Sequence, residues 1–410
     1  MDFHNDKLRQ RRDSHFCDNS SFRDLSEYAI LEDDCKGSAL WQDWQRFYYE
    51  EQTASSKPLA TELLEHQLGL CINTMLVVLI SYFLFPDLRD KTGGFFMLSY
   101  PSDDLYSIGP QDLKLVLGFM VFFTAIRAAS LDYMLSPLAA RLGITKTKTQ
   151  TRFAEQSYMI IYYTLYWSWG LRLFVHHTPT EVDGAESLLV SLWAGFPQLR
   201  LSASLKCYYI SQLAFWSQQI AVLHLEHRRK DHLQMLLHHI VTIVLLAGSY
   251  SYRQWRAGNA VLVCMDLVDI ILPLAKVLRY LSLQRCCDAA FAVFVGVWII
   301  TRHIFFLAIC WSIHKHVQVT TMAYGTYSTS TGELLSLESN DDILINIFQP
   351  FVDPLAKSVA FNVNIRRLFL GILLLLQGIT IAWFAMIVRV IVRMIRGEGA
   401  TDSRSDDEED

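Results

Sequence analysis

Eight long apolar runs alternate with polar segments along the 410 residues of this chain. Each run is long enough to cross a bilayer as a helix, because a hydrocarbon core of about 30 Å requires about 20 mostly apolar residues. The runs lie at 68–86, 113–135, 155–175, 203–224, 236–252, 258–281, 289–312 and 368–395. This pattern predicts an all-α polytopic membrane protein with about eight transmembrane helices.

The polar segments between the runs predict which side of the membrane each one faces. Lys and Arg are frequent in the N-terminal segment, at 136–154, at 225–235 and beside the end of the last run. They are sparser for their length at 87–112, 176–202 and 313–366. Because positively charged loops tend to remain in the cytosol, both termini are expected there. The 313–366 segment is then a long lumenal excursion whose structure the sequence does not indicate.

These boundaries divide the chain into four parts. They are a cytosolic N-terminal segment (1–67), the first two spans with their loops (68–148), a six-span core (149–397) and an acidic, disordered cytosolic tail (398–410). Ser403 and Ser405 precede the carboxylates of this tail and are predicted phosphorylation sites, although a solubilising tail has the same composition. No cleavable signal peptide is visible, so the first apolar run is expected to target the chain to the membrane.

Composition narrows the class further. Hydrophobic residues make up 52% of the chain, which suits a membrane protein better than a soluble enzyme. The net charge is −5 and the basic residues form no long stripe, so no nucleic-acid partner is expected. The eight cysteines lack CxxC or zinc-type spacing, which favours small buried hydrophobes over a disulfide framework.

Four ionisable side chains interrupt two neighbouring apolar runs. His238 and His239 are adjacent in one run, and Asp266 and Asp269 follow in the next. Ionisable groups at bilayer depth are costly and usually mark a pathway or a reactive site. The structural alternative for a histidine is a satisfied polar core residue. For the aspartates it is helix–helix hydrogen bonding or an ion pair with Lys276, Arg279 or Arg302. These alternatives explain the four together poorly.

The residue types suggest how these side chains could share a reaction. Consecutive histidines on a helix point about 100° apart, so one is expected to react while the other orients it or moves a proton. Histidine can act as a general base or as a nucleophile near neutral pH. Asp266 and Asp269 share a helix face at i, i+3 and could fix a histidine tautomer, stabilise imidazolium or accept a proton from an amine.

Basic residues flank the same region. Arg228, Arg229 and Lys230 precede the histidine run and could bind the phosphates of an anionic co-substrate such as coenzyme A, or could serve only as a topology signal. Arg302 and His303 lie within the seventh run and are candidate cavity-lining residues, with a purely structural role as the alternative. All five are expected to bind substrate.

Clustered histidines also raise an iron-dependent lipid hydroxylase as an alternative. His224, His227 and His232 precede the adjacent pair, but the HxxHH pattern of diiron membrane enzymes is missing. No metal is therefore expected, and metal content of the purified protein would test the alternative.

The sequence around these side chains resembles a known family. HRRKDHLQMLLHHIVTIVLLAGSYSY and GNAVLVCMDLVDIILPLAKVLRY are similar to the signature of the ceramide synthases, the longevity-assurance members of the TLC-domain superfamily. Further agreement lies in LGFMVFFTAIR, RFAEQSYMIIYYTLYWSWG, LWAGFPQ, KCYYISQLAFWSQQIAVLHLE and FVGVWIITRHI. The resemblance covers about 110–397 and is strongest to fungal members.

The resemblance implies an activity and its surroundings. Ceramide synthases (sphingosine N-acyltransferases) join a fatty acyl group from acyl-CoA to the amine of a sphingoid base such as dihydrosphingosine or phytosphingosine, in the endoplasmic reticulum membrane. His238, His239, Asp266 and Asp269 match the family's essential residues, and 149–397 matches its TLC domain. No cofactor beyond the co-substrate acyl-CoA is implied. A small single-span regulatory subunit and homo- or hetero-dimers are implied partners.

The same motif is compatible with two further functions. A paralogue from a toxin gene cluster, conferring resistance to sphinganine-analogue toxins, would keep the same reactive residues. A lipid sensor or transporter on this scaffold would bind lipid without forming an amide, but it has no need for the complete His–Asp set.

Overall fold

A computed structural model describes residues 59–179, 181–225, 231–317, 322–337 and 343–396 of this protein. Chain contacts separate residues 1–63 from a compact unit formed by residues 64–410, and the description below concerns the second unit. Most of the N-terminal segment, the acidic tail with Ser403 and Ser405, and the basic cluster Arg228, Arg229 and Lys230 lie outside the described residues.

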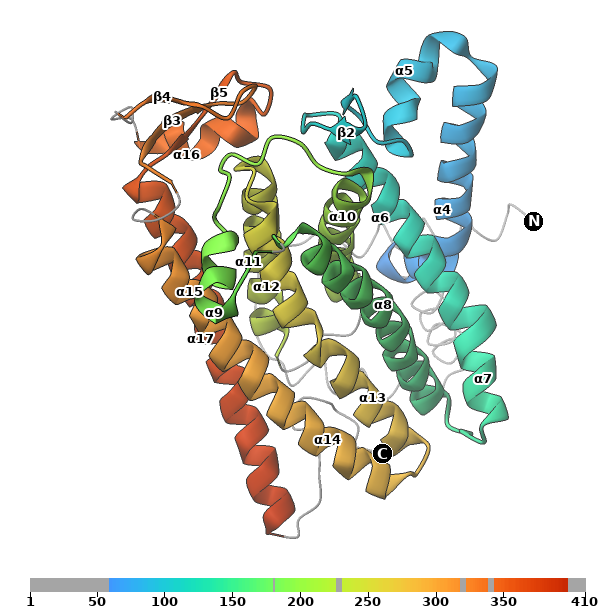
Figure 1. Ribbon diagram of the computed structural model, residues 1–410. Helices are drawn as coiled ribbons and strands as arrows, with labels where there is room; N and C mark the ends of the chain where they lie inside the picture. The colour runs from blue at the N-terminus through green and yellow to red at the C-terminus, as the bar shows by residue number, and fades with distance from the viewer. Residues whose placement is uncertain (1–58, 180, 226–230, 318–321, 338–342, 397–410) are drawn as a thin grey trace, which may run out of the picture. The chain divides into compact units, whose positions relative to one another are not determined.

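Every predicted apolar run lies on a helix or a helix pair (Figure 1). The eight segments are α4 (Leu59–Leu84), α6–η3–α7 (Asp112–Ala129, Ser130–Leu135, Ser136–Arg141), α8 (Thr147–His177), α10 (Ala203–Leu225), α11 (His232–Ser251), α12–α13 (Trp255–Asp266, Val268–Tyr280), α14–η4–α15 (Gln284–Trp298, Ile299–Phe305, Phe306–Lys315) and α17 (Val363–Ile395). The elements η3 and η4 are π-helical turns that join the helices on either side of them.

Five of these segments are long and apolar enough to cross a membrane. They are Glu65–Leu84, Asp112–Arg141, His232–Ser251, Gln284–Lys315 and Val363–Arg393. The helices α8 and α10 are long enough, but they carry many polar and aromatic side chains, and α12 and α13 are each too short to span alone. A polytopic membrane protein is therefore confirmed, and the count of eight spans stays a prediction.

A buried ion pair joins α6 and α10 at one end of the helix bundle. The Lys206 ammonium of α10 lies 2.7 Å from a carboxylate oxygen of Asp112, at the start of α6, and both side chains are buried. The same ammonium donates to the carbonyl oxygens of Ser99 and Ser107, at 2.7 and 2.6 Å. Because a buried charge needs partners, these contacts hold the segment before α6 against α10.

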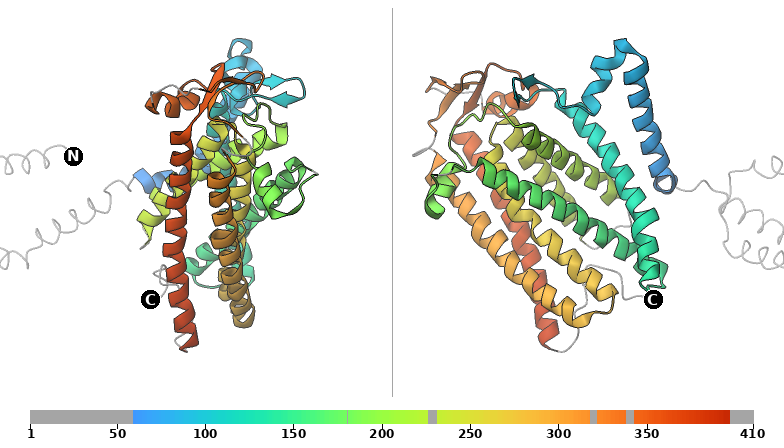
Figure 2. Two further views of the ribbon diagram at one scale, coloured as in Figure 1. Left: turned by 60° about the vertical axis from the view of Figure 1, so that its left-hand side comes forward. Right: turned by 45° about the vertical axis from the view of Figure 1, so that its right-hand side comes forward.

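Short elements occupy the connections between the long helices. They are η1 (Pro86–Leu88), α5 (Arg89–Thr92), η2 (Gly93–Phe95), the hairpin of β1 (Pro101–Ser102) and β2 (Leu105–Tyr106), and α9 (Gly184–Ser191). The 313–366 segment contains an antiparallel sheet in the order β4–β3–β5 (Leu334–Ser336, Gly325–Ser328, Ser358–Phe361) and α16 (Ile343–Val352). Figures 1 and 2 show this sheet at one end of the helices and the α13–α14 turn at the other.

The small sheet packs on the bundle through aromatic side chains. Tyr327 of β3 and Phe361 of β5 are buried, and both rings contact Phe196, with centroid distances of 5.0 and 5.3 Å. Gly325 pairs with Phe361 and Ser328 with Ser358 in the β3–β5 register. The strands are too short for a two-residue hydrophobic period to stand out, which is why the sequence did not indicate them.

Candidate active site

The helix α11 presents the histidine pair to the interior of the bundle. His238 and His239 are both buried, and their ring centroids lie 5.8 Å apart. Trp216 of α10 packs edge-on against both imidazoles, at 5.6 and 5.4 Å, and Trp383 of α17 packs on His238 at 5.1 Å. Two neighbouring helices therefore hold the imidazole rings of α11 in place with aromatic side chains.

The two aspartates lie at an interruption in the sixth predicted span. Asp266 ends α12 and Asp269 is in the first turn of α13, because the helical hydrogen-bond ladder breaks at Leu267 even though its dihedrals remain helical (φ −60°, ψ −41°). Pro273 follows in α13 and lacks the N–H that would bond the carbonyl of Asp269. A single continuous helix over 258–281 was expected, and the polar groups occupy the place where it is divided.

Arg302 bridges this interruption from the neighbouring helix. Its NH2 nitrogen donates to the carbonyl oxygen of Met265 at 2.8 Å and to Oδ2 of Asp269 at 3.0 Å. Its guanidinium stacks on Trp298 at 4.5 Å, and its side chain is 2% exposed. Arg302 lies in the π-helical turn η4, a kind of distortion that is frequent at functional sites.

A network that the sequence analysis missed supports Asp266. Gln212 of α10 is fully buried and donates from Nε2 to Oδ2 of Asp266 at 3.1 Å. Its carbonyl oxygen accepts from the Tyr162 hydroxyl at 3.2 Å, and the Tyr208 hydroxyl lies 3.3 Å from its Nε2. The available signal was a glutamine inside an apolar run, which a buried polar network explains better than packing does.

Two cavities meet at these side chains. One cavity has an almost entirely apolar surface, and the other, which is larger, has charged residues in its wall. Both are lined by Trp216, His238, Asp269 and Arg302, called the junction cluster below. Asp266 lines only the apolar cavity and His239 only the polar one, so of the two histidines His238 alone lines both cavities.

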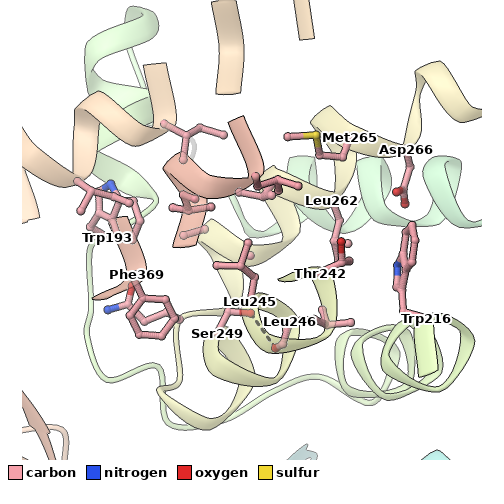
Figure 3. Close-up of a pocket in the computed structure, with 18 of the residues that line it drawn as sticks. Trp193, Trp216, Thr242, Leu245, Leu246, Ser249, Leu262, Met265, Asp266 and Phe369 are labelled. Carbon is pink, nitrogen blue, oxygen red and sulfur yellow. Dashed lines mark hydrogen bonds between the residues drawn. The ribbon is translucent and has the colours of Figure 1, made fainter. Parts of the chain in front are cut away.

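The apolar cavity extends from the junction cluster toward the end of the bundle that carries the sheet. Figure 3 shows Asp266 and Trp216 on one side of it and Trp193 and Phe369 on the other. The cavity follows α11 from His238 to Ser249, which is about 16 Å at 1.5 Å per residue. The shape is that of an elongated, mainly apolar site with the junction cluster and Asp266 at one end, and Gln254 and Arg366 also line it.

Charges of both signs line the polar cavity. The cations are Arg127, Lys276 and Arg279, and the anions include Glu155 and Asp288. Phosphate binding was predicted for the basic cluster at 228–230, which lies outside the described residues. Within the described part of the chain, Arg127, Lys276 and Arg279 are the cations that share this cavity with the histidines and Arg302.

His303 lies apart from the junction cluster. It lines neither cavity; its Nδ1 is 2.8 Å from Nε2 of Gln377, and its ring packs on Phe384 at 5.0 Å. Within the described ranges, no three His, Cys, Asp or Glu side chains gather as ligands of a metal ion would. Of the predicted site residues that the structure describes, the two histidines, the two aspartates and Arg302 come together.

Comparison with known proteins assigns the family. The family model of the TLC domain matches residues 152–389, which contain the whole junction cluster. A sphingosine N-acyltransferase-like protein of Alternaria alternata is 38% identical over 84% of this chain and 76% of its own length. This chain belongs to the ceramide synthase family of TLC-domain proteins. The resemblance noted in the sequence motifs is thereby confirmed.

Two more relatives of this ceramide synthase family member come from other fungi. A sphingosine N-acyltransferase of Schizosaccharomyces pombe is 36% identical over 84% of this chain and 80% of its own length. A ceramide synthase of Gibberella moniliformis is 33% identical over 82% of this chain and 77% of its own length. The similarity therefore extends beyond the TLC domain to most of both sequences.

Proposed function

We propose that this protein transfers a fatty acyl group from acyl-CoA to the amine of a sphingoid base and so forms ceramide. The names of its relatives support this reaction. The observation that carries it is that His238, Asp269 and Arg302 lie where an apolar and a polar cavity meet. A thioester between an acyl chain and coenzyme A has the same division into an apolar and a charged part.

Each cavity suits one part of the substrates. The apolar cavity accepts the acyl chain: its 16 Å along α11 match an extended chain of a dozen or so carbons, since C–C bonds of about 1.5 Å advance such a chain by about 1.3 Å per carbon. Arg127, Lys276 and Arg279 in the polar cavity supply cations for the phosphates of coenzyme A. The thioester carbonyl is then placed at the junction cluster.

His238 is the reacting histidine in this proposal, because it alone of the pair lines both cavities. Its buried Nδ1 has no hydrogen-bond partner among the described residues. Either the imidazole removes a proton from the amine, or it takes the acyl group first and passes it on. In both routes a C–N amide bond replaces the C–S bond, and the thiolate of coenzyme A takes up the proton that the amine loses.

Arg302 stabilises the negative charge that develops on the thioester oxygen. Its buried Nε has no hydrogen-bond partner among the described residues, while its NH2 nitrogen is held by Met265 and Asp269. A donor that is fixed before the reaction in a site of low dielectric stabilises an oxyanion effectively. The apolar surroundings also exclude water, which favours transfer to the amine over hydrolysis.

Amide formation in membranes that contain only this chain tests the proposal. Labelled dihydrosphingosine and a panel of acyl-CoAs should give ceramide with the wild type and none with His238→Ala. His314→Ala, an exposed histidine near the end of α15, is the matched control and should remain active. Correctly inserted wild type that forms no ceramide from any acyl-CoA, with or without a fungal regulatory subunit, would refute the proposal.

A second measurement on the same proteins separates the two routes. A covalent acyl group that is attached to the wild type, is absent from His238→Ala and is released by hydroxylamine indicates transfer through the imidazole. Label that never appears on the wild type, together with normal ceramide formation, indicates direct attack by the amine.

We also propose residence in the endoplasmic reticulum membrane with both termini in the cytosol, and phosphorylation of Ser403 and Ser405. The distribution of Lys and Arg between the loops supports this orientation. A glycosylation acceptor inserted in the β3–β4 turn should be modified, whereas one appended to either terminus should not.

A further inference from the structure

The helix α16 exposes an apolar face to its surroundings. Leu344 is 69% exposed, Phe348 56% and Val352 82%, and Ile345 and Leu355 are more than half exposed as well. Positions separated by four and eight residues lie on one side of a helix. The exposed side of α16 is therefore a continuous apolar strip, called the α16 face below.

The opposite side of α16 makes the polar contacts. Asn346 is buried, and the carbonyl oxygens of Asn346 and Ile347 both accept from the Tyr252 hydroxyl at 3.0 Å. Gln349 donates to the carbonyl oxygen of Ser358 in β5 at 3.0 Å. This arrangement is the reverse of a helix on a water-facing surface, which buries its apolar side and exposes its polar side.

The helix α16 lies beside the start of a membrane-spanning helix. The helix α16 packs against α17, whose apolar span begins at Val363, and Figure 1 shows α16 running across that end of the bundle. Leu368, in the second turn of α17, is the first of its exposed large apolar side chains. The helix α16 therefore lies next to the start of an apolar span.

Charged groups border this apolar surface. Asp353 and Lys357, which follow α16, and Arg367, in the second turn of α17, are exposed, whereas the described residues of α16 from Leu344 to Val352 include no charged side chain. Lys and Arg side chains beside an apolar surface suit the level of lipid phosphates. A helix with one apolar side, lying across the end of a span, fits the boundary between headgroups and acyl chains.

We propose that α16 is an interfacial membrane helix that inserts the α16 face into the lipid headgroup boundary at the start of α17. Lipid is favoured over a second copy or another protein because α16 contacts the start of an apolar span and its exposed side chains are apolar. Lipid also covers this surface without a complementary protein shape.

An anchored α16 also supports the far end of the apolar cavity. The Tyr252 ring, whose hydroxyl bonds α16, lies 6.1 Å from the Phe351 ring and 5.2 Å from the Phe369 ring. Phe369 lines the apolar cavity. The lipid contact, α16, Tyr252 and the cavity wall therefore form one series of packed side chains.

Site-specific photocrosslinking in the membrane tests the proposal. Phe348→p-benzoylphenylalanine adds a photoreactive group to a side chain of similar shape, and Glu333→p-benzoylphenylalanine, in the exposed β3–β4 turn, is the matched control. After illumination of the full chain in phosphatidylcholine nanodiscs and in native membranes, intact mass should show phospholipid adducts at position 348 at least several-fold above those at 333.

Three results would overturn the proposal. They are adducts at 348 to a second copy of the chain, adducts to another protein, and lipid adducts at 348 no more frequent than at 333. Unchanged ceramide synthesis by both variants verifies their folding. Because the adduct mass does not depend on acyl transfer, failure of this proposal is distinguishable from failure of the proposed function.

Discussion

Replacing Arg302 by lysine tests the role of the guanidinium at the junction cluster. In the wild type, Nη2 of Arg302 donates hydrogen bonds to Met265 and Asp269, and its Nε can donate to the substrate. Lysine keeps the positive charge but has one compact ammonium in place of a planar fork of donors. It can pair with Asp269, but it cannot at the same time hold the Met265 carbonyl and present a fixed N–H to the thioester oxygen.

The expected loss follows from the single donor removed. Loss of one oxyanion donor typically costs about 2.7–4 kcal/mol of transition-state stabilisation, or about 10²–10³-fold in kcat. We expect Arg302→Lys to lower kcat by about 10²-fold and to change KM by less than about threefold. Breaking a buried ion pair typically costs about 3–5 kcal/mol of folding stability. The loss of stability here should be smaller, because lysine keeps the positive charge and the Asp269 side chain is 32% exposed.

The assay is steady-state ceramide formation at several acyl-CoA concentrations, with thermal unfolding of the purified protein measured in parallel. Arg200→Lys is the matched control, since Arg200 forms an exposed ion pair with Asp103 at 3.4 Å and should tolerate the change. An Arg302→Lys enzyme with wild-type kcat would refute the oxyanion role. A rise in KM alone would make Arg302 a binding residue.

Three further predictions concern the groups around the junction cluster and the ends of the bundle. Gln212→Leu should lower the unfolding temperature by several degrees, because it leaves the Asp266 carboxylate without its buried donor, at about 1–3 kcal/mol per unsatisfied group; an unchanged melting curve would contradict the network. Lys206→Met should destabilise by about 3–5 kcal/mol by leaving a buried carboxylate unpaired, whereas Lys315→Met, at an exposed pair, should change the melting temperature little. The hydrogen bond from Lys315 lowers the pKa of Glu186, so this bridge stabilises the fold above the ordinary carboxyl pKa of 4.5 and is lost as the pH falls through the lowered value. Glu186→Gln should thus shift the melting temperature slightly at neutral pH and not at all in acid, and a shift that grows in acid would reverse this assignment.

The candidate reactive residues could be recognised in the sequence because their chemistry conflicts with their surroundings. His238, His239, Asp266 and Asp269 are ionisable groups in apolar runs, and no lipid-facing helix needs them. Arg302 stood out for the same reason. Gln212 and Trp216 did not, since a glutamine and a tryptophan in an aromatic-rich helix are common, and only their neighbours across the bundle give them a role.

The elements that the sequence missed depend on contacts between distant segments. The strands β3 and β5 are four residues each, separated by 29 residues, and their pairing is stabilised by aromatic packing on Phe196. A hydrogen bond from Arg302 to the Met265 carbonyl links two distortions. They are the division of the sixth predicted span at Leu267 and the π-helical turn at Arg302. Neither distortion can be read from one helix alone, because each is stabilised by the other.

The sequence by itself determined the class of the protein, its main helices and the candidate reactive side chains, because apolar length and misplaced charge are local properties of the chain. Only the tertiary structure decided that His238, Asp269 and Arg302 share one point between two cavities, that His303 lies outside it, and that α16 turns its apolar side outward. The physical reason is that cavities and exposed faces are formed between helices. Their shape depends on which surfaces pack together, and the hydrophobic period of a single helix records only that it has a buried side.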